Sequence, residues 1–175
     1  MQSPSGAGHH GWMTLMVRRA VAGDLAGVAR VGQEAWPATY LSFAGQEYVE
    51  ENLAAWWSPA ALEQALESLL LVAVTPDDEV AGCLEIGELD GRPVMWKLYV
   101  RPAWQGQHIG SELLRAAVDQ LSAPVLLTEY IAQNEVAGRW YAARGFRELR
   151  REARPRGLDV VWLQLDLARY RSSTR

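Results

Sequence analysis

The stretch from Leu98 to Ser111 brings several backbone N–H groups toward one point. A strand-like run ends at Val100, a loop containing Gly106 follows, and a helical pattern begins near Ile109. The first N–H groups of a helix have no partner inside the helix, and its positive end attracts anions. No Gly-Lys-Ser/Thr triplet follows, and the Gly-x-Gly-x-x-Gly pattern is absent. The stretch therefore predicts a site that holds a diphosphate without cleaving it, with a plain strand-to-helix turn as the alternative.

One carboxylate interrupts an otherwise apolar strand row. Residues 125–130 are typical of a strand, and strand alternation places Glu129 on the same face as Val125 and Leu127. Burial on such a face raises the pKa of a carboxyl group toward the range useful for a general base. Glu85 on an earlier strand and a water molecule are alternative bases. The sequence thus offers a base without fixing its identity.

The apolar patterns predict the elements that must position these groups. Alternating or continuous apolar runs predict seven strands, at 15–17, 69–75, 80–87, 94–100, 125–130, 146–152 and 158–167. Apolar residues at helical spacing predict helical stretches at 25–36, 46–57, 59–69, 109–121 and 134–144, and about four helices are expected around the sheet.

Several single residues mark where these elements begin and end. Asp24 is a candidate N-cap for the first helix, and Pro37 should end it. The pair Ser58-Pro59 predicts a cap followed by a first helical turn. Asp90-Gly91 predicts a hairpin inside a three-stranded antiparallel meander.

Chain length and cysteine content favour one compact domain. The 175 residues make little more than one domain at roughly 150 residues each. Cys83 is the only cysteine, so no internal disulfide can form, and we expect a reducing, cytoplasmic compartment. Residues 1–12 lack periodicity and a signal-peptide pattern, so a flexible extension is expected there. The domain is expected to span 13–170, followed by a tail at 171–175.

The charge distribution excludes some classes of partner. Residues 31–91 contain twelve acidic residues and no Lys or Arg, whereas eight arginines lie from Arg147 onward. A nucleic-acid-binding domain is usually basic throughout, so we expect no nucleic-acid partner. No apolar run approaches the roughly 18 residues of a membrane span, so no membrane partner is expected either. Neither a Cys-rich nor a His-rich cluster indicates a metal site.

Two motifs in order resemble the GNAT superfamily of acetyl-CoA-dependent N-acetyltransferases. In Val100–Ser111, Gln105 and Gly110 match the family loop Gln/Arg-x-x-Gly-x-Gly/Ala, and Gly106 fits it as well. Further on, the chain resembles the family's second motif at Asn134, Ala137, Tyr141, Gly145 and Phe146. His108 departs from the pattern at a position where the family prefers glycine; we interpret it as a tolerated substitution, the alternative being a ligand or catalytic histidine.

The resemblance implies a fold and a cofactor site. The fold is α/β (α+β): a mixed, mostly antiparallel sheet splayed between its fourth and fifth strands, with acyl-CoA lying in the gap. Acetyl-CoA is the implied co-substrate, with no metal. The backbone N–H of Val100 is the implied oxyanion donor. The implied cofactor-binding residues are Leu98, Val100, Gln105, Gly106, Gln107, His108, Ile109, Gly110, Ser111, Asn134 and Tyr141.

The resemblance also implies a reaction, which is direct acetyl transfer to a primary amine. Tyr141 matches the family's general acid, and simple packing on its helix is the alternative reading. Glu129 matches the catalytic glutamate of a branch that acetylates ribosomal proteins. Trp36, Tyr40 and Glu85 are predicted substrate contacts, and the acidic stretch suits a cationic acceptor. A non-catalytic acyl-CoA sensor of the same fold is the competing hypothesis, and a homodimer is compatible with the resemblance.

Overall fold

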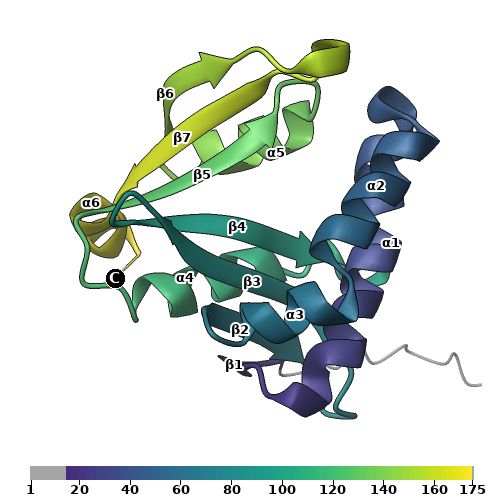
Figure 1. Cartoon of the computed structure of the whole chain (residues 1–175). Coiled ribbons are helices and arrows are strands. Elements are labelled where there is room, and N and C mark those ends of the chain that lie inside the picture. The colour runs from purple at the N-terminus through teal and green to yellow at the C-terminus, as the bar shows by residue number, and fades with distance from the viewer. Residues whose placement is uncertain (1–14, 175) are drawn as a thin grey trace, which may run out of the picture.

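The computed structural model describes residues 15–174, so the predicted extension at 1–12 lies outside the described residues. Seven strands form one sheet in the order β1-β2-β3-β4-β5-β7-β6 (Figure 1). Neighbouring strands are antiparallel except for the parallel pair β4 and β5. The strands are β1 (Met16–Arg19), β2 (Leu69–Val74), β3 (Val80–Leu89), β4 (Arg92–Val100), β5 (Val125–Ile131), β6 (Arg147–Glu152) and β7 (Val160–Asp166). The predicted mixed α/β sheet is confirmed.

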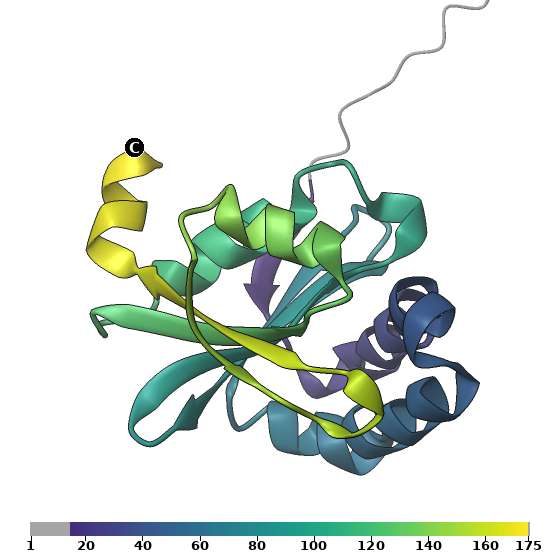
Figure 2. The same cartoon turned by 90° about the horizontal axis from the view of Figure 1, so that it is seen from above.

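Six α-helices accompany the sheet within the described residues, where about four were predicted. They are α1 (Leu25–Ala44), α2 (Gln46–Trp56), α3 (Pro59–Ala65), α4 (Ile109–Val118), α5 (Glu135–Ala142) and α6 (Leu167–Ser173). The blue helices α1 to α3 lie on one side of the sheet and the green helices α4 and α5 on the other (Figure 2). None of the helices among residues 15–174 combines the length and apolar character needed to cross a membrane.

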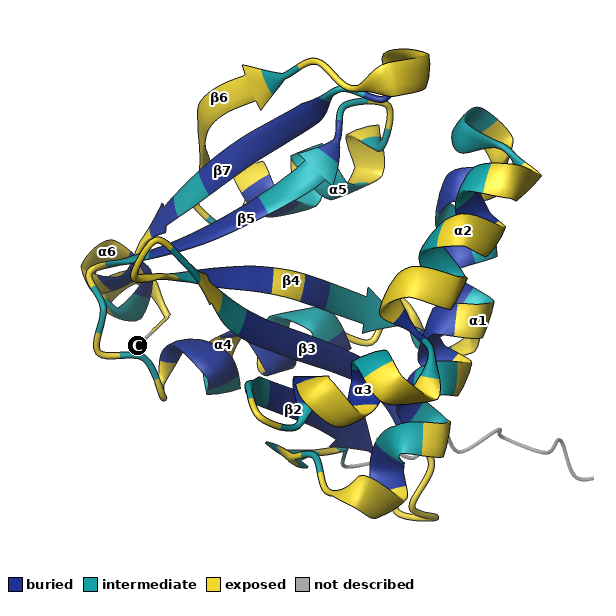
Figure 3. Cartoon of the chain, in the orientation of Figure 1, coloured by how far each residue is buried: buried dark blue, intermediate teal, exposed yellow. Residues whose placement is uncertain are grey.

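Each face of the sheet has its own core, because strand alternation sends neighbouring side chains to opposite sides. Leu84, Leu113 and Leu126 belong to the core on the α4 side. Val72, Cys83 and Leu127 belong to the core on the α1 side, so Cys83 is a fully buried strand residue. Burial is concentrated on β2 to β5 and β7, whereas β6 is exposed along nearly its whole length (Figure 3).

The sheet opens between β4 and β5, as the resemblance implied. Only Val94 with Leu127 and Met95 with Thr128 are paired across these strands. The Thr128 hydroxyl donates a 2.9 Å hydrogen bond to the Met95 carbonyl at the last paired position. Beyond this point β4 keeps β3 as its neighbour on one side, and no strand of residues 15–174 pairs with it on the other.

Two expectations for the first helix were wrong. Pro37 lies inside α1, which runs seven residues further to Ala44. An interior proline costs roughly 3 kcal/mol, but the residues on both sides, including Trp36 and Tyr40, are buried on one continuous face. The Asp24 side chain does not cap α1 either. It accepts a hydrogen bond from the Val21 N–H and pairs with Arg18.

The turn and cap predictions further along the chain were confirmed. Ser58 accepts a hydrogen bond from the Ala61 N–H with Pro59 in the first turn of α3. Asp90 and Gly91 both adopt positive φ between β3 and β4, the geometry that a two-residue hairpin turn requires. Helix α6 runs into the predicted tail at 171–175, since it extends to Ser173, and the Asp166 side chain accepts from the Arg169 N–H at its start.

Candidate active site

A cavity of about 620 Å³ lies where the sheet opens. Its walls are the end of β4, the loop before α4, the first turn of α4, one face of α5, and α1. Its lining residues are Ala35, Ala38, Thr39, Leu98, Tyr99, Val100, Trp104, Gln105, Gly106, His108, Ile109, Gly110, Ser111, Asn134, Val136, Ala137, Trp140, Tyr141 and Arg144. The structure thus brings together all the residues predicted to bind the cofactor except Gln107, which is exposed and does not line the cavity.

The free edge of β4 faces this cavity. The Arg101 N–H donates to the Ala81 carbonyl on β3 at 2.9 Å. Because backbone groups alternate along a strand, the N–H and carbonyl of Val100 and of Leu98 point the other way, toward the gap. The Gln105 side chain already donates a 3.1 Å hydrogen bond to the Val100 carbonyl. An extended amide-bearing chain can therefore pair with this edge as another strand would.

The loop before α4 adopts the conformation expected of a glycine loop despite its histidine. Gly106 has φ +79°, and His108 occupies the left-handed region at φ +60° as the N-cap of α4. A histidine at this backbone conformation costs of order 1 kcal/mol but keeps the N–H groups of the first helical turn directed outward. His108 lines the cavity as an exposed residue.

Asn134 has two functions available at the start of α5. Its Oδ1 accepts a 3.1 Å hydrogen bond from the Ala137 N–H, which caps the helix. The amide NH₂ is not used by that bond, and a primary amide carries two N–H donors. Since Asn134 also lines the cavity, those donors can serve a bound ligand.

Tyr141 is buried on α5, within the α4-side core, and its side chain reaches the cavity. Burial raises the pKa of its phenol to about 12, opposed by a hydrogen bond with Thr128 that lowers it. The phenol is therefore protonated at neutral pH and available as a donor. Its ring also packs edge-to-face on Trp140 and Phe146, so the packing role and the donor role coexist.

Glu129 lies on the opposite face of the sheet from Tyr141. Its strand neighbours Leu127 and Ile131 belong to the α1-side core, and alternation places Glu129 with them. Burial raises the pKa of the Glu129 carboxyl, and Arg154 opposes the shift. The negative charge of Glu129 in turn helps to raise the pKa of Tyr48 on α2, although burial of that phenol is the larger cause. Glu129 does not line the cavity itself.

Glu85 is placed differently from the prediction. It is buried and forms an ion pair with Lys97, its register partner on β4, and Lys97 lies 5.5 Å from the Trp57 ring centre. The ion pair joins the two neighbouring strands β3 and β4. Glu85 does not line the cavity.

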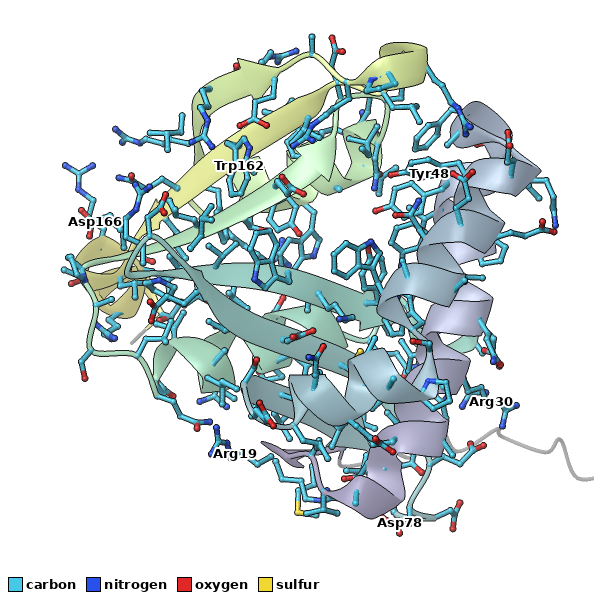
Figure 4. All side chains as sticks on the ribbon, in the orientation of Figure 1. Arg19, Arg30, Tyr48, Asp78, Trp162 and Asp166 are labelled. Atoms are coloured by element: carbon cyan, nitrogen blue, oxygen red, sulfur yellow. The ribbon has the colours of Figure 1, made fainter. Side chains whose placement is uncertain are left out.

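Trp36 and Tyr40 form an aromatic cluster beside the cavity without lining it. Their ring centroids lie 4.4 Å apart, and both also contact Tyr48. The Tyr40 hydroxyl lies 3.0 Å from the Tyr99 hydroxyl, and Tyr99 does line the cavity. Tyr48 points from α2 toward the β5–β7 part of the sheet, where Trp162 lies on β7 (Figure 4). This cluster forms the wall between α1–α2 and the opening of the sheet.

Residues of the acidic stretch 31–91 and of the basic C-terminal part form ion pairs with each other at α2. Arg156, in the turn between β6 and β7, forms ion pairs with Glu47 at 3.2 Å and Glu51 at 3.8 Å on α2. The turn is thus a surface connection, in agreement with a solvated hairpin. Among the described residues, none of the arginines from Arg147 to Arg171 lines the cavity.

Sequence reasoning missed Trp140 and Arg144 as cavity residues. Arg144 follows Tyr141 by three residues, so a helix places both side chains on one face. That spacing was the available signal, but the contact of Arg144 with Ser111 joins α5 to α4 and becomes visible only in three dimensions.

Comparisons with known proteins agree on one family. The family model described as "Acetyltransferase (GNAT) domain" matches residues 67–148. A spermidine N(1)-acetyltransferase from Thermoplasma acidophilum is 24% identical over 144 residues, covering 77% of this chain and 89% of that protein.

Solved structures show the same fold. A PaiA N-acetyltransferase from Thermoplasma acidophilum in complex with coenzyme A superimposes with a TM-score of 0.77 at 22% identity, over 88% of this chain and 99% of the other. The ribosomal-protein-S18-alanine N-acetyltransferase from Escherichia coli gives a TM-score of 0.68 at 18% identity, over 88% of this chain and 94% of the other.

Proposed function

We propose that this chain is a GNAT acetyltransferase, as the family model over residues 67–148 supports, and that it transfers an acetyl group from acetyl-CoA directly to the primary amine of a cationic acceptor. One observation carries the proposal: the free β4 edge, the N-terminus of α4 and the Tyr141 phenol all face one cavity. This combination suits a thioester attached to a phosphate-bearing chain, and its volume falls within the usual range for ligand sites.

Acetyl-CoA fits the cavity by its chemistry. The pantetheine arm carries amides, which can pair with Leu98 and Val100 along the unpartnered strand edge. The Asn134 NH₂ group supplies a further donor to that arm. The N–H groups from the loop into the first turn of α4 suit the diphosphate. With this orientation the thioester lies near Tyr141 and the Val100 N–H.

We propose that Tyr141 assists departure of the thiolate. A thiol has a pKa of about 8.5, below the value of about 12 for the Tyr141 phenol, so complete proton loss from an isolated tyrosine to the thiolate is unfavourable. The attacking amine, however, becomes positively charged as the new N–C bond forms and must lose a proton. Tyr141 donates its proton to sulfur as the C–S bond breaks, the excess proton of the nitrogen passes through water to the phenolate and restores the phenol, and the Val100 N–H stabilises the oxyanion.

Glu129 is the proposed base for the amine. An alkylamine of pKa near 10.4 is less than about 0.1% neutral at pH 7, so the reaction needs a group that removes the proton of the amine. The Glu129 carboxylate lies on the α1-side face and Tyr141 on the other. An amine that approaches from the Glu129 side would therefore attack the carbonyl from the side opposite Tyr141, which donates the proton to the leaving thiolate. Transfer through a water molecule is compatible with this placement.

A cationic acceptor fits the groups on the α2 side of the sheet. The charge of Glu129 acts on Tyr48 of α2, Tyr48 stacks on Trp36, and aromatic rings attract cations. A polyamine supplies several charges along a flexible chain, and the similarity to a spermidine N(1)-acetyltransferase supports this class first. A protein amino terminus is the second candidate. We place the reaction in the cytoplasm, where the single, buried Cys83 would stay reduced.

Release of CoA thiol from acetyl-CoA tests the proposal over a panel of amines. The panel contains spermidine, a diamine, an aminoglycoside and a short peptide with a free amino terminus. We expect turnover that depends on the amine and is fastest with a polycationic member. If the protein binds CoA in calorimetry but no amine raises thiol release above the rate in buffer, the non-catalytic acyl-CoA sensor is the better description.

A further inference from the structure

The cavity contains one guanidinium group, that of Arg144, and it comes from the turn that follows α5 and not from the glycine loop. The loop residues 105–111 include no Lys or Arg. Among the residues lining the cavity, Arg144 is the only one that is cationic at every physiological pH. The guanidinium of Arg144 would therefore supply the permanent positive side-chain charge for a ligand with several phosphate charges.

Contacts with α4 and α5 hold the Arg144 side chain in place. Its Cζ lies 3.6 Å from the centre of the Trp140 ring, so the guanidinium stacks on the indole. One nitrogen donates to the Ser111 hydroxyl at 2.7 Å and another to the Trp140 carbonyl at 3.0 Å. Trp140 in turn packs on Gly110, where an added Cβ would lie 3.3 Å from the ring. The first turn of α4 thus positions the stack.

The guanidinium keeps unused capacity for an anion. A guanidinium carries five N–H donors, and two of them are used by these hydrogen bonds. No carboxylate forms an ion pair with Arg144 within residues 15–174. Burial lowers the pKa of Arg144, yet the group stays charged because its ordinary value is so high. A part-buried, pre-oriented cation without a carboxylate partner is suited to a phosphate.

From these contacts we infer that Arg144, stacked on Trp140 and anchored to Ser111, binds a phosphate group of CoA. This inference rests on the proposed function, since it assigns a phosphate subsite within the same cavity. CoA offers two sources of that chemistry, the diphosphate and the 3′-phosphate of the ribose. The planar fork of Arg144 can donate two parallel hydrogen bonds to either one.

Calorimetric titration of Arg144→Gln with CoA tests the inference. We expect an affinity about 10- to 100-fold weaker than that of the wild type, the size typical of hydrogen bonds to a charged group. Arg139→Gln is the matched control: it removes the same charge from α5, but Arg139 is exposed, pairs with Glu135 and does not line the cavity. The control should bind CoA within about twofold of the wild type.

Titration with dephospho-CoA, which lacks the 3′-phosphate, distinguishes the two sources. If Arg144 binds the diphosphate, Arg144→Gln weakens both ligands equally. If it binds the 3′-phosphate, the wild type and Arg144→Gln bind dephospho-CoA alike. Arg144→Lys keeps the charge without the fork and should fall between the wild type and Arg144→Gln for CoA. Arg144→Lys also tests the inference if Arg144→Gln fails to fold.

Two results would overturn the assignment: unchanged CoA affinity in Arg144→Gln, or an equal loss in Arg139→Gln. Failure of the wild type itself to bind CoA is a different result, since it contradicts the proposed function as a whole. The two failures are therefore distinguishable.

Discussion

At the scale of single residues, burial acts in the same direction on the two groups proposed to move protons. It raises the pKa of the Tyr141 phenol to about 12 and raises the pKa of the Glu129 carboxyl above its usual 4.5. For the phenol the consequence is a proton that is held until a strong acceptor forms. For the carboxyl the consequence is a stronger base, because a higher pKa means a higher affinity for the proton of the amine.

Glu129→Gln should lower kcat and change its pH dependence. In the wild type the base form of Glu129 accumulates as the pH rises through its raised pKa, so that activity should rise over the same interval. The amide cannot titrate, so this acidic limb should disappear. The measurement is the pH–rate profile with acetyl-CoA and the best amine. An unchanged kcat with an unchanged acidic limb would assign the base to water.

The same variant should fold normally, and the sign of the pKa shift explains why. A carboxyl whose folded pKa is raised binds its proton more tightly in the native state, so stability falls as the pH rises from the unfolded value through the folded one. Glutamine removes this ionisation. Glu129→Gln is therefore expected to have a thermal midpoint at neutral pH no lower than that of the wild type.

At the scale of elements, α1 is held against the C-terminal end of α2 by a contact that only glycine allows. A Cβ on Gly32 would lie 2.2 Å from the Trp57 ring, and Trp57 packs in turn on Tyr99 of the cavity wall. We expect Gly32→Ala to destabilise the fold by about 1–3 kcal/mol, because Trp57 has to move from a buried position. Denaturant unfolding measures this change.

Gly23→Ala is the control for that substitution. No atom lies within 4 Å of the Cβ that it would add, and the φ of Gly23 is not in the positive region. Its stability should stay close to that of the wild type. If Gly32→Ala unfolds at the same denaturant concentration as Gly23→Ala, the Trp57 contact does not define the position of α1.

Local patterns explain which elements could be predicted from the sequence. Asp90-Gly91 and Ser58-Pro59 act through their own backbone preferences, and both were predicted correctly. Pro37 was misread because burial on both sides of it outweighs a local penalty. Helix α6 was missed because it is short, and its Tyr170 is buried against residues far away in the sequence. Tertiary packing thus explains the two elements, α1 and α6, that local sequence patterns did not predict correctly.

The same reasoning separates the predicted from the missed site residues. The backbone groups of Val100 and the loop around Gly110 follow a spacing that the sequence displays directly. The role of Glu85 depends on Lys97, twelve residues away and across a hairpin, so strand alternation alone could not show that the carboxylate is already paired. Arg144 likewise acquires its position from Ser111 on another helix.

At the scale of the whole molecule, folding brings part of the acidic stretch against basic residues from elsewhere in the sequence. Glu47 and Glu51 of the acidic stretch pair with Arg156 from the basic end, and Glu34 pairs with Arg101. At the site, Arg144 is the cavity's guanidinium, and Glu129 lies on the opposite face of the sheet. The opening between β4 and β5 joins these two faces, so cofactor and acceptor can approach one carbonyl from opposite sides.

The central claim is direct acetyl transfer at this opening, and a single-turnover experiment tests it most directly. Enzyme in excess over acetyl-CoA is mixed with the best amine, quenched, and analysed by mass spectrometry for acetyl groups on the amine and on the protein. We predict acetylated amine, no acetylated enzyme, and a rate about 10²-fold lower in Tyr141→Phe, within the range for loss of an acid catalyst. An acetylated enzyme intermediate, or an unchanged rate in Tyr141→Phe, would contradict this account.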